Sequence, residues 1–90
     1  MSTIAKTTAS AVGRKLRSLN FEPYDYATGI GCSVWQSGSS VEIANWGFAP
    51  GTASQELRNA GFIVLSVDRG NYEHDGKHFE MVTVIGRADA

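Results

Sequence analysis

The stretch SVWQSGSSVEIANW, residues 33–46, sets the faces of the predicted sheet because it reads as two short strands around a polar turn. With Gly38 and Ser39 at the turn, Trp35 pairs with Glu42 and Val34 with Ile43. Successive residues of a strand point to opposite faces. One face then carries Cys32, Val34, Val41 and Ile43, and the other carries Ser33, Trp35, Glu42, Ala44 and Trp46. The first face is apolar and is the expected core, which leaves both tryptophans on the opposite face.

A second hairpin is predicted around Asp75-Gly76, which separates FIVLSVDRGNYEH from KHFEMVTVIGR. This dipeptide suits a two-residue turn in which both residues have positive φ. The turn pairs His74 with Lys77, Glu73 with His78, Tyr72 with Phe79, Asp68 with Thr83, and Val67 with Val84. One face is then Ile63, Leu65, Val67, Val82 and Val84, and the other is Val64, Ser66, Met81, Thr83 and Ile85, with Tyr72 and Phe79 near the tip.

Two helices are predicted, over residues 4–19 and residues 53–60. In the first, apolar residues recur at spacings of three and four, which places them on one face: Ile4, Thr8, Val12, Leu16 and Leu19. The second follows a capping-box pattern of Thr52 with Gln55. Asn20 and Gly61 are expected to end the two helices, because both residue types tolerate the left-handed conformation found there.

An internal repeat links the two halves of the chain. KLRSLNF, residues 15–21, aligns with ELRNAGF, residues 56–62, at an offset of 41. The same offset places Val41 and Ile43 on Val82 and Val84. The alignment indicates a duplicated unit, and it agrees with the turn register about which face is the core.

These elements predict a single α+β domain over residues 1–90. We expect two helices packed on one face of a mainly antiparallel sheet of four to five strands, in the order α-β-β-β-α-β-β. Residues 21–26 supply the least regular strand, which Pro23 confines to an edge because proline cannot donate to a strand ladder.

Composition points to a globular protein without a membrane segment. The chain has 90 residues, of which 42% are hydrophobic and 19% are charged, with a net charge of -1. One cysteine cannot form an internal disulfide, and no run approaches the roughly 20 apolar residues that span a bilayer. We therefore expect a soluble, cytoplasmic protein.

The face opposite the predicted core is the candidate binding surface. Exposed apolar patches larger than a few hundred Å² often mark interaction sites. The candidate partner-binding residues are Trp35, Trp46, Glu42, Met81, Ile85, Tyr72 and Phe79. This pattern favours a small non-enzymatic interaction module that binds a protein partner or a second copy of itself, a regulator, inhibitor or accessory protein of bacterial or phage type. Two alternatives stay open: residues 21–26 or the GFAP segment cover this face, or a one-residue slip in register turns the tryptophans inward.

Nucleic-acid binding is the alternative function. Residues 1–21 carry Lys6, Arg14, Lys15 and Arg17 and no acid, whereas the other 69 residues carry nine acids and four bases. The basic residues could contact phosphates while exposed aromatic residues stack on unpaired bases. Against this interpretation, the net charge is negative and several acids lie in or beside the strands.

No catalytic motif, cofactor or metal site is predicted. Cys32 follows two glycines, but it has no nearby histidine in the sequence and is interpreted as a core residue. GIGCSV lacks the third glycine and the following helix of a nucleotide-binding loop. Glu73, His78 and Glu80 share a face of the second hairpin, where we expect a solvated tip rather than a metal site, or a tip that contacts a partner through Tyr72 and Phe79.

Overall fold

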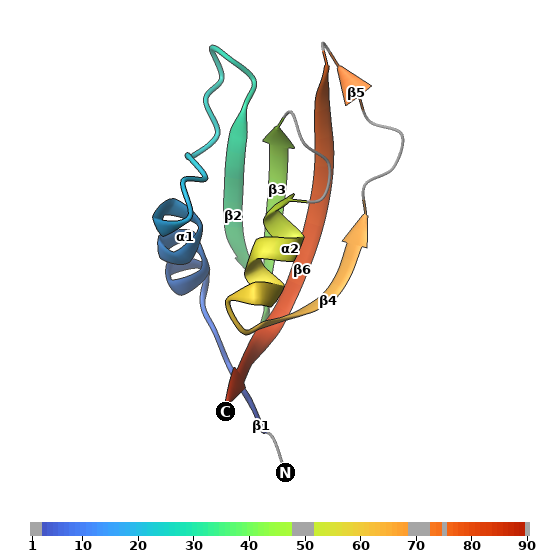
Figure 1. Ribbon diagram of the computed structural model, residues 1–90. Helices are drawn as coiled ribbons and strands as arrows, with labels where there is room; N and C mark the ends of the chain where they lie inside the picture. The colour runs from blue at the N-terminus through green and yellow to red at the C-terminus, as the bar shows by residue number, and fades with distance from the viewer. Residues whose placement is uncertain (1–2, 48–51, 69–72, 75, 90) are drawn as a thin grey trace.

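The computed structural model describes residues 3–47, 52–68, 73–74 and 76–89. Within these residues the chain forms an α+β fold, as predicted (Figure 1). The elements are β1 (Thr3–Ala5), α1 (Ala9–Ser18), β2 (Gly31–Ser37), β3 (Ser40–Gly47), α2 (Thr52–Asn59), β4 (Phe62–Asp68), β5 (Glu73–His74) and β6 (Lys77–Asp89).

All the strands belong to one antiparallel sheet centred on β6. Four long strands lie in the order β2-β3-β6-β4, and the short strands β1 and β5 pair with the two ends of β6. Val84 pairs with Val41 of β3 and with Val64 of β4, so these two strands flank β6 on opposite sides. The longest strand is therefore covered along both edges.

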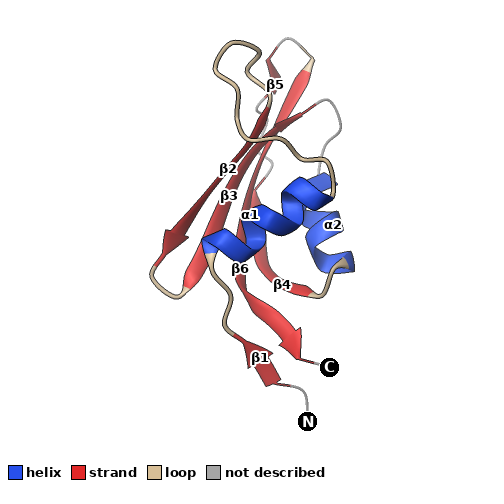
Figure 2. Ribbon diagram, turned by 90° about the vertical axis from the view of Figure 1, so that its left-hand side faces the viewer, coloured by secondary structure: helices blue, strands red, loops and turns tan. Residues whose placement is uncertain are grey.

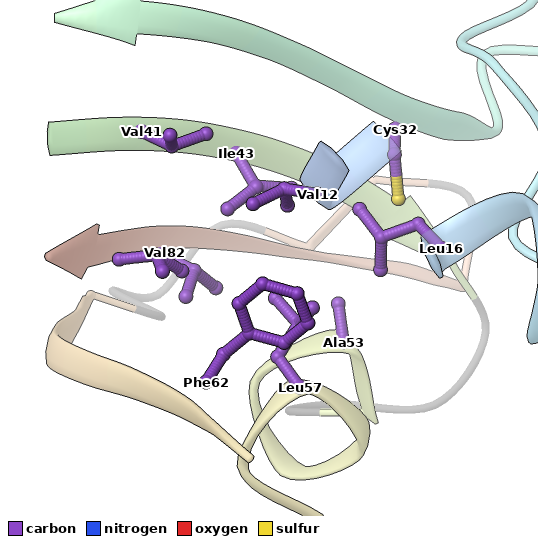
Figure 3. Packing of buried hydrophobic residues seen from close by; sticks show 10 residues of the cluster. Val12, Leu16, Cys32, Val41, Ile43, Ala53, Leu57, Phe62 and Val82 are labelled. Carbon is purple, nitrogen blue, oxygen red and sulfur yellow. The ribbon is translucent and has the colours of Figure 1, made fainter. Parts of the chain in front are cut away.

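Both helices pack on the same side of the sheet (Figure 2). They bury one apolar core against the strands, in which Val12 and Leu16 of α1 and Leu57 of α2 meet the sheet residues (Figure 3). The sheet contributes Cys32, Val41, Ile43, Phe62, Val82 and Val84, and α2 adds Ala53. The predicted core face of β2, β3 and β6 is thus confirmed.

The central registers agree with the sequence. Trp35 pairs with Glu42 and Val34 with Ile43, and the tip pairs Glu73 with His78. The predicted pairing of Tyr72 lies outside the described residues. The offset of 41 relates Glu42 to Thr83, and these two residues pair directly in the structure. The duplication itself stays a prediction.

The predicted faces of β4 are wrong in part, because the pairing of β4 with β6 is irregular. The register shifts between Ile63 and Val64 and again between Val64 and Ser66. Val67 consequently pairs with Val82 instead of Val84, and Asp68 pairs with Met81. Val64 packs against the core, whereas Leu65 is 63% exposed.

Two predicted elements also differ at the start of the chain. The first helix begins at Ala9, because the side chain of Thr8 caps it by accepting a hydrogen bond from the N–H of Ala11 at 3.2 Å. Ile4 instead pairs with Ala88 in β1. Residues 21–26 form no continuous strand and make only two isolated bridges, from Pro23 to Cys32 and from Asp25 to Ile30.

The predicted helix ends are confirmed by backbone geometry. Asn20 has φ 71° and Gly61 has φ 95°, both left-handed. No helix among the described residues is long and apolar enough to cross a membrane.

Candidate functional site

The side of the sheet away from the helices forms a continuous surface, which we call the open sheet face. It carries Ser33, Trp35, Glu42, Ala44, Trp46, Phe79, Met81 and Thr83, which alternate with core residues along β2, β3 and β6. In the described part of the chain, no helix packs on this side (Figure 2). Five of the seven predicted partner-binding residues therefore share one face.

Cross-strand pairing arranges these side chains in rows. Trp46 pairs with Phe79, and their ring centroids lie 5.0 Å apart at an interplanar angle of 45°. Trp35 pairs with Glu42, whose Oε2 accepts a hydrogen bond from the Thr83 hydroxyl at 2.9 Å. Glu42 and Trp46 are four residues apart on one strand, so the two rows lie about 13 Å apart. The small side chains of Ser33 and Ala44 lie between them.

The two tryptophans differ in their exposure. Trp46 is half-buried and lines a pocket of 330 Å³ with Tyr24, Tyr26 and the loop that follows them. Lys77 ties this loop to the tip of β6 by donating to the carbonyl of Thr28 at 3.1 Å. The segment after α1 therefore approaches the open sheet face only at the end that carries Trp46. The alternative in which residues 21–26 cover this face applies only there. Trp35 is 41% exposed.

Trp35 also lies on an edge of the sheet, because β2 pairs only with β3 along most of its length. At the start of β2, Cys32 donates to the carbonyl of Glu22 at 2.9 Å and accepts from the N–H of Tyr24 at 3.0 Å. Backbone groups of alternate residues point to the same side, so those of Val34 and Gln36 also point outward. Within the described residues these outward groups have no backbone partner.

The described pairing does not place the remaining two predicted partner-binding residues on this surface. Ile85 is the extra residue of β6 where the pairing with β4 shifts, so it pairs with no residue of β4. Tyr72 lies outside the described residues.

The opposite face of the same three strands carries a buried polar row that the sequence analysis missed. Cys32, Asn45 and Glu80 occupy paired positions on β2, β3 and β6. The thiol of Cys32 donates to Asn45 Oδ1 at 3.0 Å, and Asn45 Nδ2 donates to Glu80 Oε1 at 2.8 Å. Glu80 was placed with the solvated tip by sequence, but it is only 2% exposed. The available signal was that Asn45 alternates with the core residues Val41 and Ile43 along β3.

The surroundings of Cys32 oppose nucleophilic chemistry. Burial, and secondarily the negative charge of Glu80, raise the pKa of the Cys32 thiol from 9.0 to about 12. A cysteine nucleophile acts as the thiolate, which requires a lowered pKa. The interpretation of Cys32 as a core residue is confirmed by its 7% exposure.

The four basic residues predicted for nucleic-acid binding do not form one track. Arg14 and Lys15 line a cleft on one side of α1, whereas Arg17 lines a second pocket between α1 and β2. Lys6 is exposed between β1 and α1. All four lie on or before α1, which packs on the core side of the sheet (Figure 2), whereas the strand pairing puts Trp35 and Trp46 on the open sheet face.

Comparisons with known proteins identify no relative. No protein-family model matches the chain, and no curated protein or solved structure matches it either.

Proposed function

We propose that the chain is a protein-interaction module that binds its partner through the open sheet face. The observation that carries this proposal is the position of Trp35, an exposed tryptophan where an uncovered face meets an unpaired strand edge. Tryptophan is enriched among the residues that dominate binding energy. Its indole can enter a partner's apolar pocket at a low cost in side-chain entropy, since it has only two rotatable bonds.

The edge of β2 supports the same proposal. From Gly31 to Ser37 the strand contains no charged residue and no proline, the residues that commonly protect an edge from pairing. A partner strand could satisfy the outward groups of Val34 and Gln36 while a neighbouring side chain contacts Trp35. A role as a regulator, inhibitor or accessory protein of bacterial or phage type, and a cytoplasmic location, stay predictions.

Nucleic-acid binding receives less support from the geometry. Its phosphate contacts and its stacking residues would lie on opposite sides of the sheet, so one strand of nucleic acid could not use both at once. Glu42 adds a negative charge beside Trp35, in the same row of the open sheet face.

The test compares Trp35→Ser with Leu65→Ser. Leu65 is 63% exposed on β4, at the edge of the sheet opposite to β2, so its variant also removes an exposed apolar side chain and serves as a matched control. A partner is captured with the wild type from nuclease-treated lysate, purified, and titrated against all three proteins; sedimentation of each protein alone measures self-association.

We expect Trp35→Ser to weaken the interaction at least tenfold, and Leu65→Ser to stay within about twofold of the wild type. Binding to a protein should change little between 0.1 M and 0.5 M salt, whereas phosphate contacts weaken steeply. Equal affinity of the Trp35→Ser variant and the wild type, for both partner and self, would refute the proposal.

A further inference from the structure

A basic cleft lies between α1 and the C-terminal part of β6. Its volume is 380 Å³, and its lining includes Arg14 and Lys15 of α1, Arg87 of β6 and Phe62 of β4. The sequence separates Arg87 from the other two cations by more than 70 positions. Helix packing on the sheet brings the three together.

Arg87 reaches this cleft because of the irregular pairing next to it. Regular alternation would place Arg87 with Met81 and Thr83 on the open sheet face. The extra residue Ile85 shifts the register, so Arg87 pairs with the buried Phe62 and lies on the helix side. Its guanidinium lies 5.5 Å from the centroid of the Phe62 ring, a cation–π contact that orients it.

The charges in the cleft lack compensation. None of the lining residues is acidic. Among the residues that the structure describes, Arg14, Lys15 and Arg87 form no ion pair, and all three are exposed or half-buried. Three like charges around one cleft repel one another, so a bound anion lowers the energy of this arrangement.

We propose that this cleft binds a phosphate monoester. Such a group carries between -1.5 and -2 charges at neutral pH and offers three acceptor oxygens, which suits three cationic donors. The half-buried Thr7 adds a hydroxyl to the lining. A compact ligand fits better than a long polyanion, because the net charge of the chain is -1 and none of the acids among the described residues lines this cleft. This site is independent of the open sheet face.

The experiment is an NMR titration of the ¹⁵N-labelled chain with inorganic phosphate, and then with phosphoserine, at pH 7.5 and constant ionic strength. We expect saturable shifts at residues of the cleft. Arg87→Gln and Arg14→Gln should each weaken binding about tenfold, because each removes one charge-assisted donor. Arg58→Gln, which removes an exposed cation on α2 outside this cleft, should stay within about twofold.

The spectrum of each variant also shows whether the variant is folded. If Arg87→Gln does not fold, the comparison of Arg14→Gln with the wild type still tests the proposal. Absence of saturable binding would overturn the proposal, and so would equal affinity of the folded Arg14 or Arg87 variant and the wild type. A parallel titration with a ten-nucleotide oligothymidylate distinguishes a phosphate monoester from a nucleic-acid backbone. Binding of the oligonucleotide without binding of phosphoserine would also refute the proposal.

Discussion

Glu80 shows how one side chain links the sheet to a helix. Its Oε1 accepts from Asn45 Nδ2 and from the N–H of Ala53 in the first turn of α2, both at 2.8 Å. This turn contains no acidic residue of its own. A carboxylate at a helix N-terminus is stabilising, because it accepts from free N–H groups and complements the helix dipole. The strand β6 therefore provides the acid that the first turn of α2 lacks.

The thiol of Cys32 should make the folded chain less stable at alkaline pH. Its pKa is about 12 in the folded chain and 9.0 without these surroundings, so the unfolded chain loses the proton first. Stability from this group is complete below pH 9 and is lost as pH rises toward 12. Between pH 8 and 10.5 we expect the wild type to lose about 2 kcal/mol more than Cys32→Ser, which does not ionise in this range.

Urea denaturation of both proteins at the two pH values measures this difference. The serine variant is the matched control, because its hydroxyl can still donate to Asn45 and because the two chains differ at no other position. Parallel loss of stability in the two proteins would mean that Cys32 ionises in the folded state as readily as in the unfolded state.

At the scale of elements, turn residues and the alternation of apolar residues predicted the features that depend on a single hairpin. The turn at Gly38 and Ser39 and the alternation around it were sufficient to assign the core faces of β2 and β3. The faces of β4 were partly wrong, because a strand irregularity depends on the fit of two strands and has no distinct residue pattern here. A similar limit applies to Ile4, whose spacing suits the helix although it pairs with the end of β6.

A pair of substitutions tests these faces. Ile43 is fully buried, so Ile43→Ala should destabilise the fold by about 2 to 4 kcal/mol through lost packing and a residual cavity. Leu65→Ala also shortens an aliphatic side chain, but Leu65 is 63% exposed. This substitution should therefore destabilise the fold by less than about 0.5 kcal/mol. Chemical denaturation measures both changes in stability. A large loss of stability in Leu65→Ala would indicate that Leu65 is buried, as the regular strand predicted from the sequence requires.

At the scale of the whole molecule, the sequence indicated the open sheet face but not the basic cleft. Trp35, Trp46 and Phe79 could be grouped from two hairpin turns alone. Arg87 could not be grouped with Arg14 and Lys15, because that required both the shift at Ile85 and the packing of α1 on the sheet.

The sheet separates the two proposed sites, and this arrangement predicts that they act independently. Trp35 lies on the open sheet face, whereas Arg87 contacts Phe62 on the helix side, and the two residues share no described contact. Substitutions at separate sites without shared partners usually add within about 0.5 kcal/mol. Trp35→Ser should therefore leave the affinity for inorganic phosphate within about twofold of the wild type, and Arg87→Gln should leave partner binding equally unchanged.

The variant that carries both substitutions completes the cycle. Its affinity for phosphate should equal that of Arg87→Gln, and its affinity for the partner should equal that of Trp35→Ser. If Trp35→Ser weakened phosphate binding tenfold while its spectrum stayed native, the coupling between the faces would amount to about 1.4 kcal/mol. Such coupling would have to pass through β6, because this strand pairs with β3 beside the open sheet face and carries Arg87 at the cleft. The sheet would then transmit binding from one side to the other instead of separating two sites.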